Sequence, residues 1–193
     1  MNVHPTIQLR TALGILLIAA LSSCGKYREV AESAYPDQVI YLPAAKSIFE
    51  VSPPGDTYEV PTPGQPASFR VDREEGLVII PLGVVRGGVS ATGSISVNIK
   101  SRPDTVSALI GRQQLAAEML PANAYSMPAG VELADGETTA IFELALSLAY
   151  LTERPGEAFA VAVQISSNGH KTNPALETAI VVFNSSLLNN ETK

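Results

Sequence analysis

Short hydrophobic runs separated by turn residues fill most of the chain after residue 36. Alternation is clearest at Gly93–Lys100, where apolar and polar residues take turns. A period of two places Ile95, Val97 and Ile99 on one face, as in a half-buried strand. Similar runs bounded by Gly, Pro and Asp predict strands at Gln38–Leu42, Ser47–Val51, Ala67–Val71, Tyr125–Met127, Gly130–Leu133, Thr138–Leu146, Ala158–Ile165 and Thr178–Phe183.

Two further stretches complete the pattern. Leu77–Val85 is a nearly continuous aliphatic run that predicts a buried strand, although Pro81 within it cannot donate to a ladder. Thr105–Leu120 instead has apolar residues at helical spacing, with Asp104 placed to cap its start. Gly111 inside it weakens a helix by ~1 kcal/mol. We interpret this stretch as one short helix across an edge or end of the sheets; core packing explains it better than partner docking.

Many short strands, one helix and no alternation of strands with helices predict an all-β antiparallel sandwich. We expect this domain to occupy residues 37–184 and to be followed by a polar, frayed tail at residues 185–193.

The segment Thr11–Cys24 has the pattern of a secretory signal peptide. Arg10 precedes an apolar run from Ala12 to Leu21, which is well short of the roughly twenty residues of a membrane-spanning helix. The closing residues, Leu-Ser-Ser-Cys, resemble the lipobox of bacterial lipoproteins. This resemblance implies that residues 1–23 are removed, that Cys24 is lipidated, and that residues 24–36 form a tether. Gly25 rather than Asp after Cys24 implies transport to the outer membrane, on its cell-surface or periplasmic face.

The stretch after Asn123 carries a second resemblance. It contains the runs AYSMP, VEL, ADGE and TAIF, which end at Phe142. These runs resemble the N-terminal immunoglobulin-like domain of unknown function of Bacteroidetes-type surface lipoproteins found with polysaccharide utilisation. Met127 stands where that family commonly has Leu. The resemblance implies an immunoglobulin-like sandwich and a setting in cell-surface polysaccharide handling, but it supplies no catalytic residues. The family's usual second, glycan-handling module is not part of this sequence.

Composition narrows the partners. The formal net charge is −6, and the scattered Lys and Arg residues form no basic stripe, so nucleic acid is not an expected partner. The charged fraction of 17% is low, as suits a β-rich domain. Cys24 is the sole cysteine, so no disulfide within the domain is expected.

Catalytic chemistry has few candidates. After loss of the signal peptide, His170 is the one remaining histidine, in a polar loop where simple exposure is the better interpretation. Paired acids occur at Glu74–Glu75 and at Asp135 with Glu137, but adjacent acids in turns are usually solvated. We therefore expect no enzyme activity, no metal and no cofactor.

Two kinds of binding or modification site remain open. Tyr41 and Tyr58 are candidates for a glycan-binding platform, or else they pack into the core and against an edge. Thr105, in Asp104-Thr105-Val106, resembles a bacterial O-glycosylation site, and a plain helix start is the alternative.

The leading hypothesis is a non-enzymatic, lipid-anchored outer-membrane lipoprotein that acts as an accessory or interaction module in a glycan-uptake assembly. Lipidated Cys24 would anchor the protein in the membrane, and strand edges or loops would contact a protein partner. Direct binding of a surface polysaccharide is the alternative. A structural subunit of a surface fibre is a further one.

Overall fold

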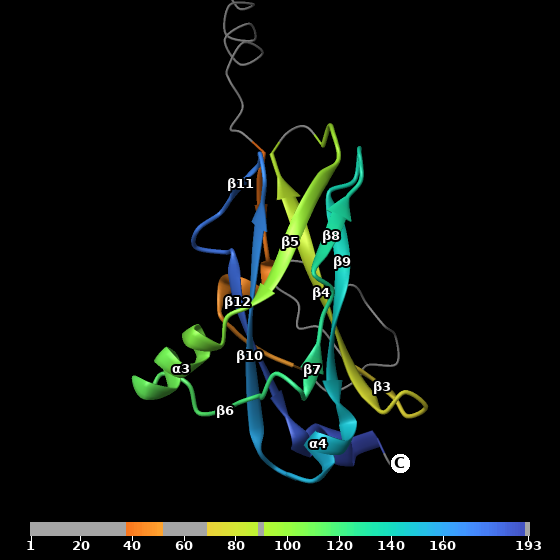
Figure 1. The fold of residues 1–193 in the computed structure, drawn as a ribbon, viewed down its shortest axis with the longest axis vertical. Coiled ribbons are helices and arrows are strands. Elements are labelled where there is room, and N and C mark those ends of the chain that lie inside the picture. The colour runs from red at the N-terminus through yellow and green to blue at the C-terminus, as the bar shows by residue number, and fades with distance from the viewer. Residues whose placement is uncertain (1–37, 52–68, 89–90, 192–193) are drawn as a thin grey trace, which may run out of the picture. The chain divides into compact units, whose positions relative to one another are not determined.

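The computed structural model describes residues 38–51, 69–88 and 91–191, without the side chains of 190 and 191 (Figure 1). The chain divides into Met1–Pro36 and Asp37–Lys193, and all described residues belong to the second unit. Cys24 and Tyr58 lie outside the described residues.

One sheet, sheet A, has the strand order β11-β1-β4-β9-β7, with β3 also paired to β4. Its strands are β1 (Val39–Tyr41), β3 (Arg70–Asp72), β4 (Leu77–Gly87), β7 (Tyr125–Ser126), β9 (Thr139–Ser147) and β11 (Lys171–Thr172).

The second sheet, sheet B, has the order β2-β12-β10-β5-β8, with β6 also paired to β10. Its strands are β2 (Ile48–Glu50), β5 (Ile95–Ser101), β6 (Glu118–Met119), β8 (Gly130–Leu133), β10 (Ala158–Ser167) and β12 (Thr178–Asn184). The two sheets confirm the all-β sandwich. The long strands pair antiparallel, whereas β1 with β11, β10 with β6 and β12 with β2 pair parallel.

The core lies between the sheets. Even-numbered residues of β4 and β9 point inward, so one face of each strand is apolar and buried. Sheet A contributes Val78, Ile80, Leu82, Val84, Phe142, Leu144 and Leu146. Sheet B contributes Ile95, Val97, Ile99, Phe159, Val161, Val163, Val181 and Phe183. The predicted face of Ile95, Val97 and Ile99 is confirmed.

Within the described residues, four short helical segments accompany the sheets. They are the 3₁₀ helix η2 (Pro43–Lys46), α3 (Pro103–Gly111), α4 (Leu148–Thr152) and the 3₁₀ helix η3 (Ser185–Glu191). The chain passes between the two sheets at several points, among them η2 and the segment between β7 and β8. At the start of β8, Gly130 is required by close approach, because a Cβ there would lie 2.7 Å from the carbonyl oxygen of Val97.

The helix is shorter than predicted. It ends at Gly111, and Gln113 then takes the left-handed conformation with φ of 57°. The N–H of Gln114 donates to the Leu109 carbonyl and that of Gln113 to the Ile110 carbonyl, which is the Schellman arrangement. Glycine usually occupies this left-handed position, so the sequence carried no stop signal at Gln113. The continuation to Leu120 was therefore wrong.

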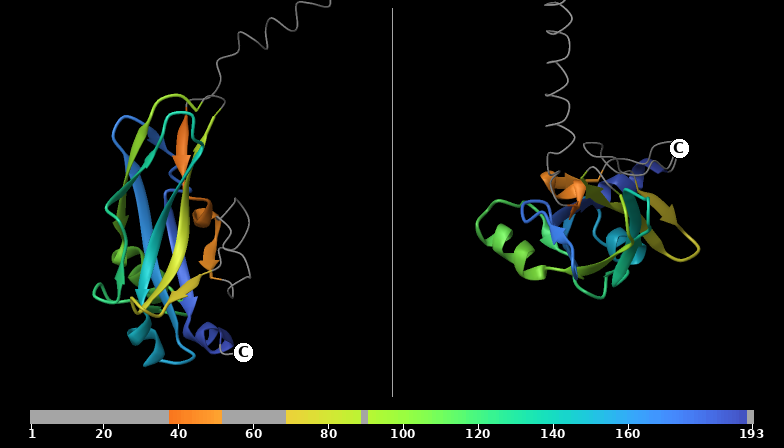
Figure 2. Two further views of the ribbon diagram at one scale, coloured as in Figure 1. Left: turned by 90° about the vertical axis from the view of Figure 1, so that its right-hand side faces the viewer. Right: turned by 90° about the horizontal axis from the view of Figure 1, so that it is seen from above.

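The placement of α3 also differs from the prediction. It packs on the outer face of sheet B, where Val106, Ala160, Ala162 and Ile180 form a second apolar cluster with Leu115. Figure 2 shows α3 on one side of the sandwich and the β3–β4 hairpin on the other. Core packing is thus confirmed as a role of this helix, over a face rather than an edge.

An ion pair fixes the start of α3. Asp104 lies inside the first turn and does not cap the helix; Arg102 precedes Pro103 and donates to both Asp104 oxygens, at 3.0 and 2.7 Å. Arg102 Nη1 also donates to Gln164 Oε1 of β10 at 2.7 Å. The hydrogen bond from Arg102 is the largest cause of the lowered pKa of Asp104; desolvation opposes it, and the charge of Arg102 lowers the pKa further.

Other local features were not predicted. β11 lies within a stretch interpreted as a polar loop, and it pairs with β1. The polar residues from Ser185 form η3, and Ser185 is 3% exposed. The Ser185 hydroxyl donates to the Arg154 carbonyl at 2.6 Å and accepts from the Glu157 N–H at 3.0 Å.

Pro81 fits within β4 because of the direction in which its backbone faces. The Arg86 N–H donates to the Thr138 carbonyl at 2.8 Å, so the backbone N–H and C=O groups of the even-numbered residues of β4 point toward β9. Pro81 therefore faces the opposite side, between the residues paired with β1 and those paired with β3. No strand among the described residues pairs with that part of β4, so the missing N–H costs no ladder bond.

Arg86 closes one end of the core. It is 4% exposed, and its guanidinium donates to the carbonyls of Thr92 at 3.2 Å and Gly93 at 2.8 Å. It also reaches the carbonyls of Ala134 at 3.3 Å and Leu133 at 3.4 Å. One side chain therefore ties β4 to the β4–β5 and β8–β9 connections.

Replacing Arg86 should destabilise the fold. In Arg86→Met the buried carbonyls lose their donor, so we expect the free energy of unfolding to fall by about 3 kcal/mol. Urea denaturation followed by circular dichroism measures this. The control is Arg70→Met, which removes an exposed ion pair and should cost less than about 1 kcal/mol. Equal losses in the two variants would contradict the role given to Arg86.

The Arg102–Asp104 pair gives a pH-dependent prediction. In Arg102→Gln the pKa of the Asp104 carboxyl should rise toward its ordinary value, which NMR of the carboxyl carbon against pH would detect. Because the folded pKa is depressed, the pair stabilises the fold above the unfolded pKa, and this stabilisation is lost as the pH falls through the folded pKa. The stability difference between wild type and variant should therefore narrow in acid. An unchanged Asp104 titration would refute the assignment.

Candidate functional site

The residues singled out from the sequence do not converge on one site. Tyr41 is half-buried on β1 in sheet A, and its Cε1 would lie 3.5 Å from a Cβ at Gly87. Thr105 is half-buried in the first turn of α3, on sheet B. Because Tyr58 and Cys24 lie outside the described residues, the tyrosine platform and the lipid anchor stay predictions.

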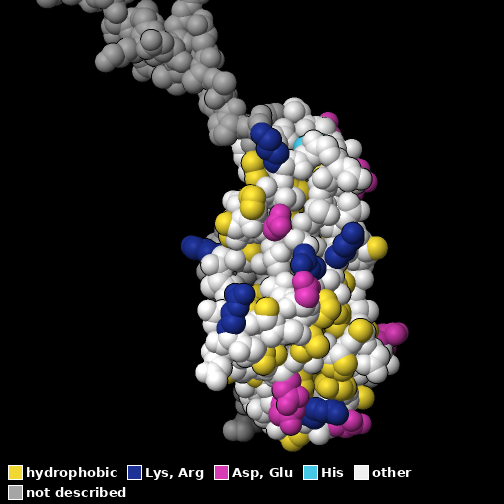
Figure 3. Space-filling view, turned by 60° about the vertical axis from the view of Figure 1, so that its left-hand side comes forward, with side chains coloured by type: hydrophobic (Ala, Val, Ile, Leu, Met, Phe, Trp, Pro, Cys, Tyr) yellow, Lys and Arg dark blue, Asp and Glu magenta, His cyan; other side chains and the backbone are white. Residues whose placement is uncertain are grey.

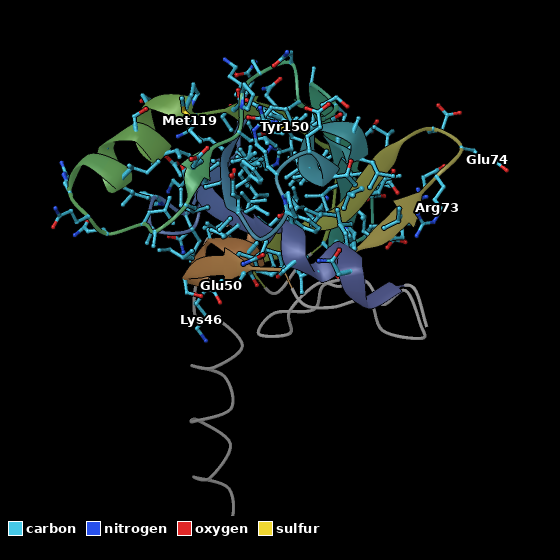
Figure 4. All side chains as sticks on the ribbon, turned by 90° about the horizontal axis from the view of Figure 1, so that it is seen from below. Lys46, Glu50, Arg73, Glu74, Met119 and Tyr150 are labelled. Carbon is cyan, nitrogen blue, oxygen red and sulfur yellow. The ribbon has the colours of Figure 1, made fainter. Side chains whose placement is uncertain are left out.

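The acidic and histidine candidates occupy loops and turns. Asp135 Oδ1 accepts the Gly93 N–H at 2.6 Å, so this carboxylate holds the β4–β5 connection in place. His170 is half-buried just before β11. Figure 4 shows Arg73 and Glu74 at the tip of the β3–β4 hairpin, on the other side of the domain from Met119. Within the described ranges no cluster of His, Cys, Asp and Glu is placed to hold a metal ion.

An open backbone edge is present on β9. The Ser147 N–H donates to the Ala124 carbonyl, while the Thr138 carbonyl accepts from β4. The backbone N–H and C=O groups of the odd-numbered residues of β9 therefore point away from β4. β7 pairs with β9 only through Ser126 opposite Ala145 and Tyr125 opposite Leu146. Among the described strands, none pairs with Thr139, Ile141 and Glu143 on that side. β8 of sheet B lies alongside β9 without pairing with it (Figure 1).

The side chains along this edge are suited to contact. Ile141 is 40% exposed, and its neighbour on β4 is Gly83, which has no side chain to cover it. Glu143 is exposed, and its charge is engaged by Arg70 at 3.3 Å. Beside it, a shallow hollow of about 380 Å³ is lined by Ser126, Met127, Pro128, Glu143 and Ala145. This stretch of β9 thus combines backbone groups that have no ladder partner on one side with an exposed isoleucine.

The other described edges are shorter. β2 has three residues, β7 and β11 have two each, and β8 has four with Glu132 exposed. Proteins commonly protect sheet edges by short strands, lysines or prolines. The open part of β9 carries neither lysine nor proline. We therefore take the β9 edge, defined as Thr139–Glu143, as the candidate interaction site.

The outer face of sheet B offers a second surface. Ile48 and Met119 are 39% and 42% exposed at its two sides, and Figure 3, from the side of α3, shows apolar side chains on the lower part of this face. A hollow of about 390 Å³ lies between β2, β10 and η3; its lining is Glu50, Val51, Ala116, Ala158, Val182, Asn184, Ser186 and Leu187. This hollow mixes polar and apolar groups, and its lining includes no aromatic ring of the kind that sugar binding generally uses.

The strand that carries the candidate site is predicted by the sequence, but the site itself is not. The alternation in Thr138–Leu146 predicts a half-buried strand, and Ile141 interrupts an otherwise polar or small outward face. An apolar residue at an outward position was the available signal. Whether the residue Ile141 has a strand paired beside it depends on where β7 ends, and the sequence does not show this.

Among the described residues, no helix has the length and apolar character needed to cross a bilayer.

No family model matches the chain, and no curated protein sequence does. Among solved structures, the chain is similar to a putative carbohydrate binding protein from Bacteroides ovatus, with 14% identity and a TM-score of 0.52 over 75% of this chain and 36% of that one. An auxiliary nutrient binding protein from Bacteroides thetaiotaomicron has 18% identity and a TM-score of 0.47 over 72% and 44% of the two chains.

A multidomain protein including DUF1735 from Bacteroides ovatus has 16% identity and a TM-score of 0.43 over 56% of this chain and 36% of that one. The chain therefore spans about a third to under half of the length of these three proteins. All three come from Bacteroides. The first likeness shows a shared fold.

Proposed function

We propose that this chain is a non-enzymatic, lipid-anchored outer-membrane lipoprotein that acts by protein contact as an accessory module of a glycan-uptake assembly. The observation that carries the proposal is the open β9 edge, where unpaired backbone groups lie beside the exposed Ile141. An added strand can pair with such groups and gains affinity from main-chain hydrogen bonds.

Further observations support each part. The signal pattern ending at Cys24 supports the anchor, and the fold likeness to a putative carbohydrate binding protein of Bacteroides supports the glycan setting. The structural bond of Asp135 and the loop position of His170 support a role without catalysis. Half-burial of Tyr41 against Gly87 favours protein contact over a tyrosine platform for sugars.

The anchor is tested by Cys24→Ala. Loss of the acylated thiol should move the protein from the membrane fraction to the soluble fraction, which immunoblotting of fractionated cells measures. Ser23→Ala, which keeps the thiol, is the matched control and should stay with the membrane. Retention of the Cys24→Ala chain on membranes would overturn the proposed anchor.

Contact at the edge is tested by a photo-crosslinking amino acid in place of Ile141. In intact cells this chain should give covalent protein adducts on irradiation, because a docked strand lies against that side chain. The control carries the same probe in place of Asn98, which is exposed on β5 in sheet B. The proposal predicts adducts from position 141 well above those from position 98.

Equal adduct yields at positions 141 and 98 would argue against an interaction module that uses this edge. Retardation in polysaccharide affinity gels that is lost in Tyr41→Ala would instead assign direct glycan binding to the chain.

A further inference from the structure

We propose that Asn168 is a modification site, at which the chain deamidates without an enzyme through attack by its own backbone. The residue lies in the connection between β10 and β11 and is followed by Gly169. The inference goes beyond the proposed function and does not depend on it, because it concerns the chemistry of one loop.

The reaction needs only the groups of this dipeptide and water. The backbone nitrogen of Gly169, after losing its proton to solvent base, attacks the side-chain carbonyl carbon of Asn168. A carbon–nitrogen bond forms, and the carboxamide nitrogen gains a proton and leaves as ammonia, which closes a cyclic succinimide. Water then opens the ring. Opening at the side-chain carbonyl gives aspartate, and opening at the backbone carbonyl gives isoaspartate.

Both reacting groups are free in the structure. Asn168 is exposed, and no described residue forms a hydrogen bond with its carboxamide. The Gly169 N–H likewise donates to no described carbonyl. A Cβ placed on Gly169 would have no atom within 4 Å, so the space around the attacking nitrogen is open. The nitrogen can therefore reach the carboxamide without breaking an existing contact.

The two flanks of the loop are held in place. The Ser167 hydroxyl donates to the Ser96 carbonyl at 2.8 Å on one side. On the other side the Asn173 N–H donates to the Ile40 carbonyl at 2.9 Å. Only the tip that contains Asn168 is thus without such bonds, and exposed loop tips are where proteins commonly tolerate chemical change.

Other asparagines in the stretch from residue 91 to 188 lack this freedom at the attacking nitrogen. In three cases the next N–H already donates a hydrogen bond, which keeps its nitrogen from the side chain. These bonds run from Ile99 to Ala129 after Asn98, from Ala124 to Pro121 after Asn123, and from Ser185 to Glu157 after Asn184, each at 2.9 Å.

Asn173 is blocked in a different way. Pro174 follows it and has no backbone N–H with which to attack. The Asn173 Oδ1 also accepts the N–H of Ala175 at 3.0 Å, which holds the carboxamide. Among the asparagines of this stretch, Asn168 is therefore the one with both groups free.

The expected consequence is local to β11. Isoaspartate moves a side-chain carbon into the main chain and so lengthens the loop, and either product adds a negative charge. β11 has two residues and pairs with β1, so a longer connection should loosen this pairing. Amide hydrogen exchange should then be faster at Asn173 in the isoaspartate form than in fresh Asn168→Asp, which carries the charge alone. Equal exchange would contradict this consequence.

Ageing of the full chain tests the site. After incubation in warm, mildly alkaline buffer, mass spectrometry of proteolytic peptides measures the replacement of amide nitrogen by oxygen at each asparagine. Conversion at Asn168 should be at least about tenfold faster than at Asn123, which is also exposed. The rate should rise with pH, because the attacking nitrogen must first lose its proton.

Two comparisons separate the fold's contribution from that of the dipeptide. A synthetic peptide of residues 163–174 gives the rate without the fold, and the folded chain should convert at a rate of the same order. A protein isoaspartyl methyltransferase, which methylates isoaspartate and not aspartate, should label the aged wild type. Aged Asn168→Gln should lose most of this label, whereas the matched control Asn123→Gln should keep it.

Three results would overturn the proposal. They are absence of conversion at Asn168, equal rates at Asn123 and Asn168, and a folded rate more than about tenfold below that of the peptide. The last of these would mean that the fold restrains the groups described as free. None of them bears on the membrane anchor or on the β9 edge, which have their own tests.

Discussion

The antiparallel ladder between β4 and β9 is the constraint on which the rest of the domain depends. It runs from Leu77 opposite Ser147 to Val85 opposite Thr139 and sets which residues of both strands point into the core. Even-numbered side chains are buried between the sheets, and odd-numbered ones face outward. The same register turns the odd-numbered backbone groups of β9 toward an edge that β7 covers only in part. Core packing and the interaction edge therefore follow from one alignment.

Buried polar residues complete the sandwich where the ladders end. Arg86 satisfies carbonyls from two connections beyond the end of β4, and Ser185 bridges Arg154 and Glu157 beyond the end of β12. Near the second of these sites, the Tyr150 ring packs edge-on against Phe159, with centroids 5.5 Å apart. Each polar side chain is costly to bury without partners, so its hydrogen bonds specify how the loops close over the core.

The functional argument rests on an edge rather than on a pocket of catalytic groups. An exposed, regular strand edge is an aggregation hazard unless it has a partner, and most edges of this domain are short. β9 is the exception among the described strands: the departure of the chain from sheet A after Ser126 leaves Thr139–Glu143 without a ladder partner on one side. The same sandwich architecture in a Bacteroides protein shows that the fold is shared. The edge chemistry belongs to this chain's own residues.

The sequence by itself determined the longer strands and the buried face of the alternating ones, because alternation and turn residues are local signals. It missed the two-residue strands β6, inside the predicted helix, and β11, inside a predicted polar loop. It also determined the signal pattern ending at Cys24. It did not determine the end of α3, because Gln113 adopts a left-handed conformation that glycine usually takes. Only the tertiary structure decided that Arg86 is buried and that one side of β9 is unpaired. Both depend on hydrogen-bond partners distant in sequence, such as Leu133 and Ala134 for Arg86, and local patterns carry no record of them.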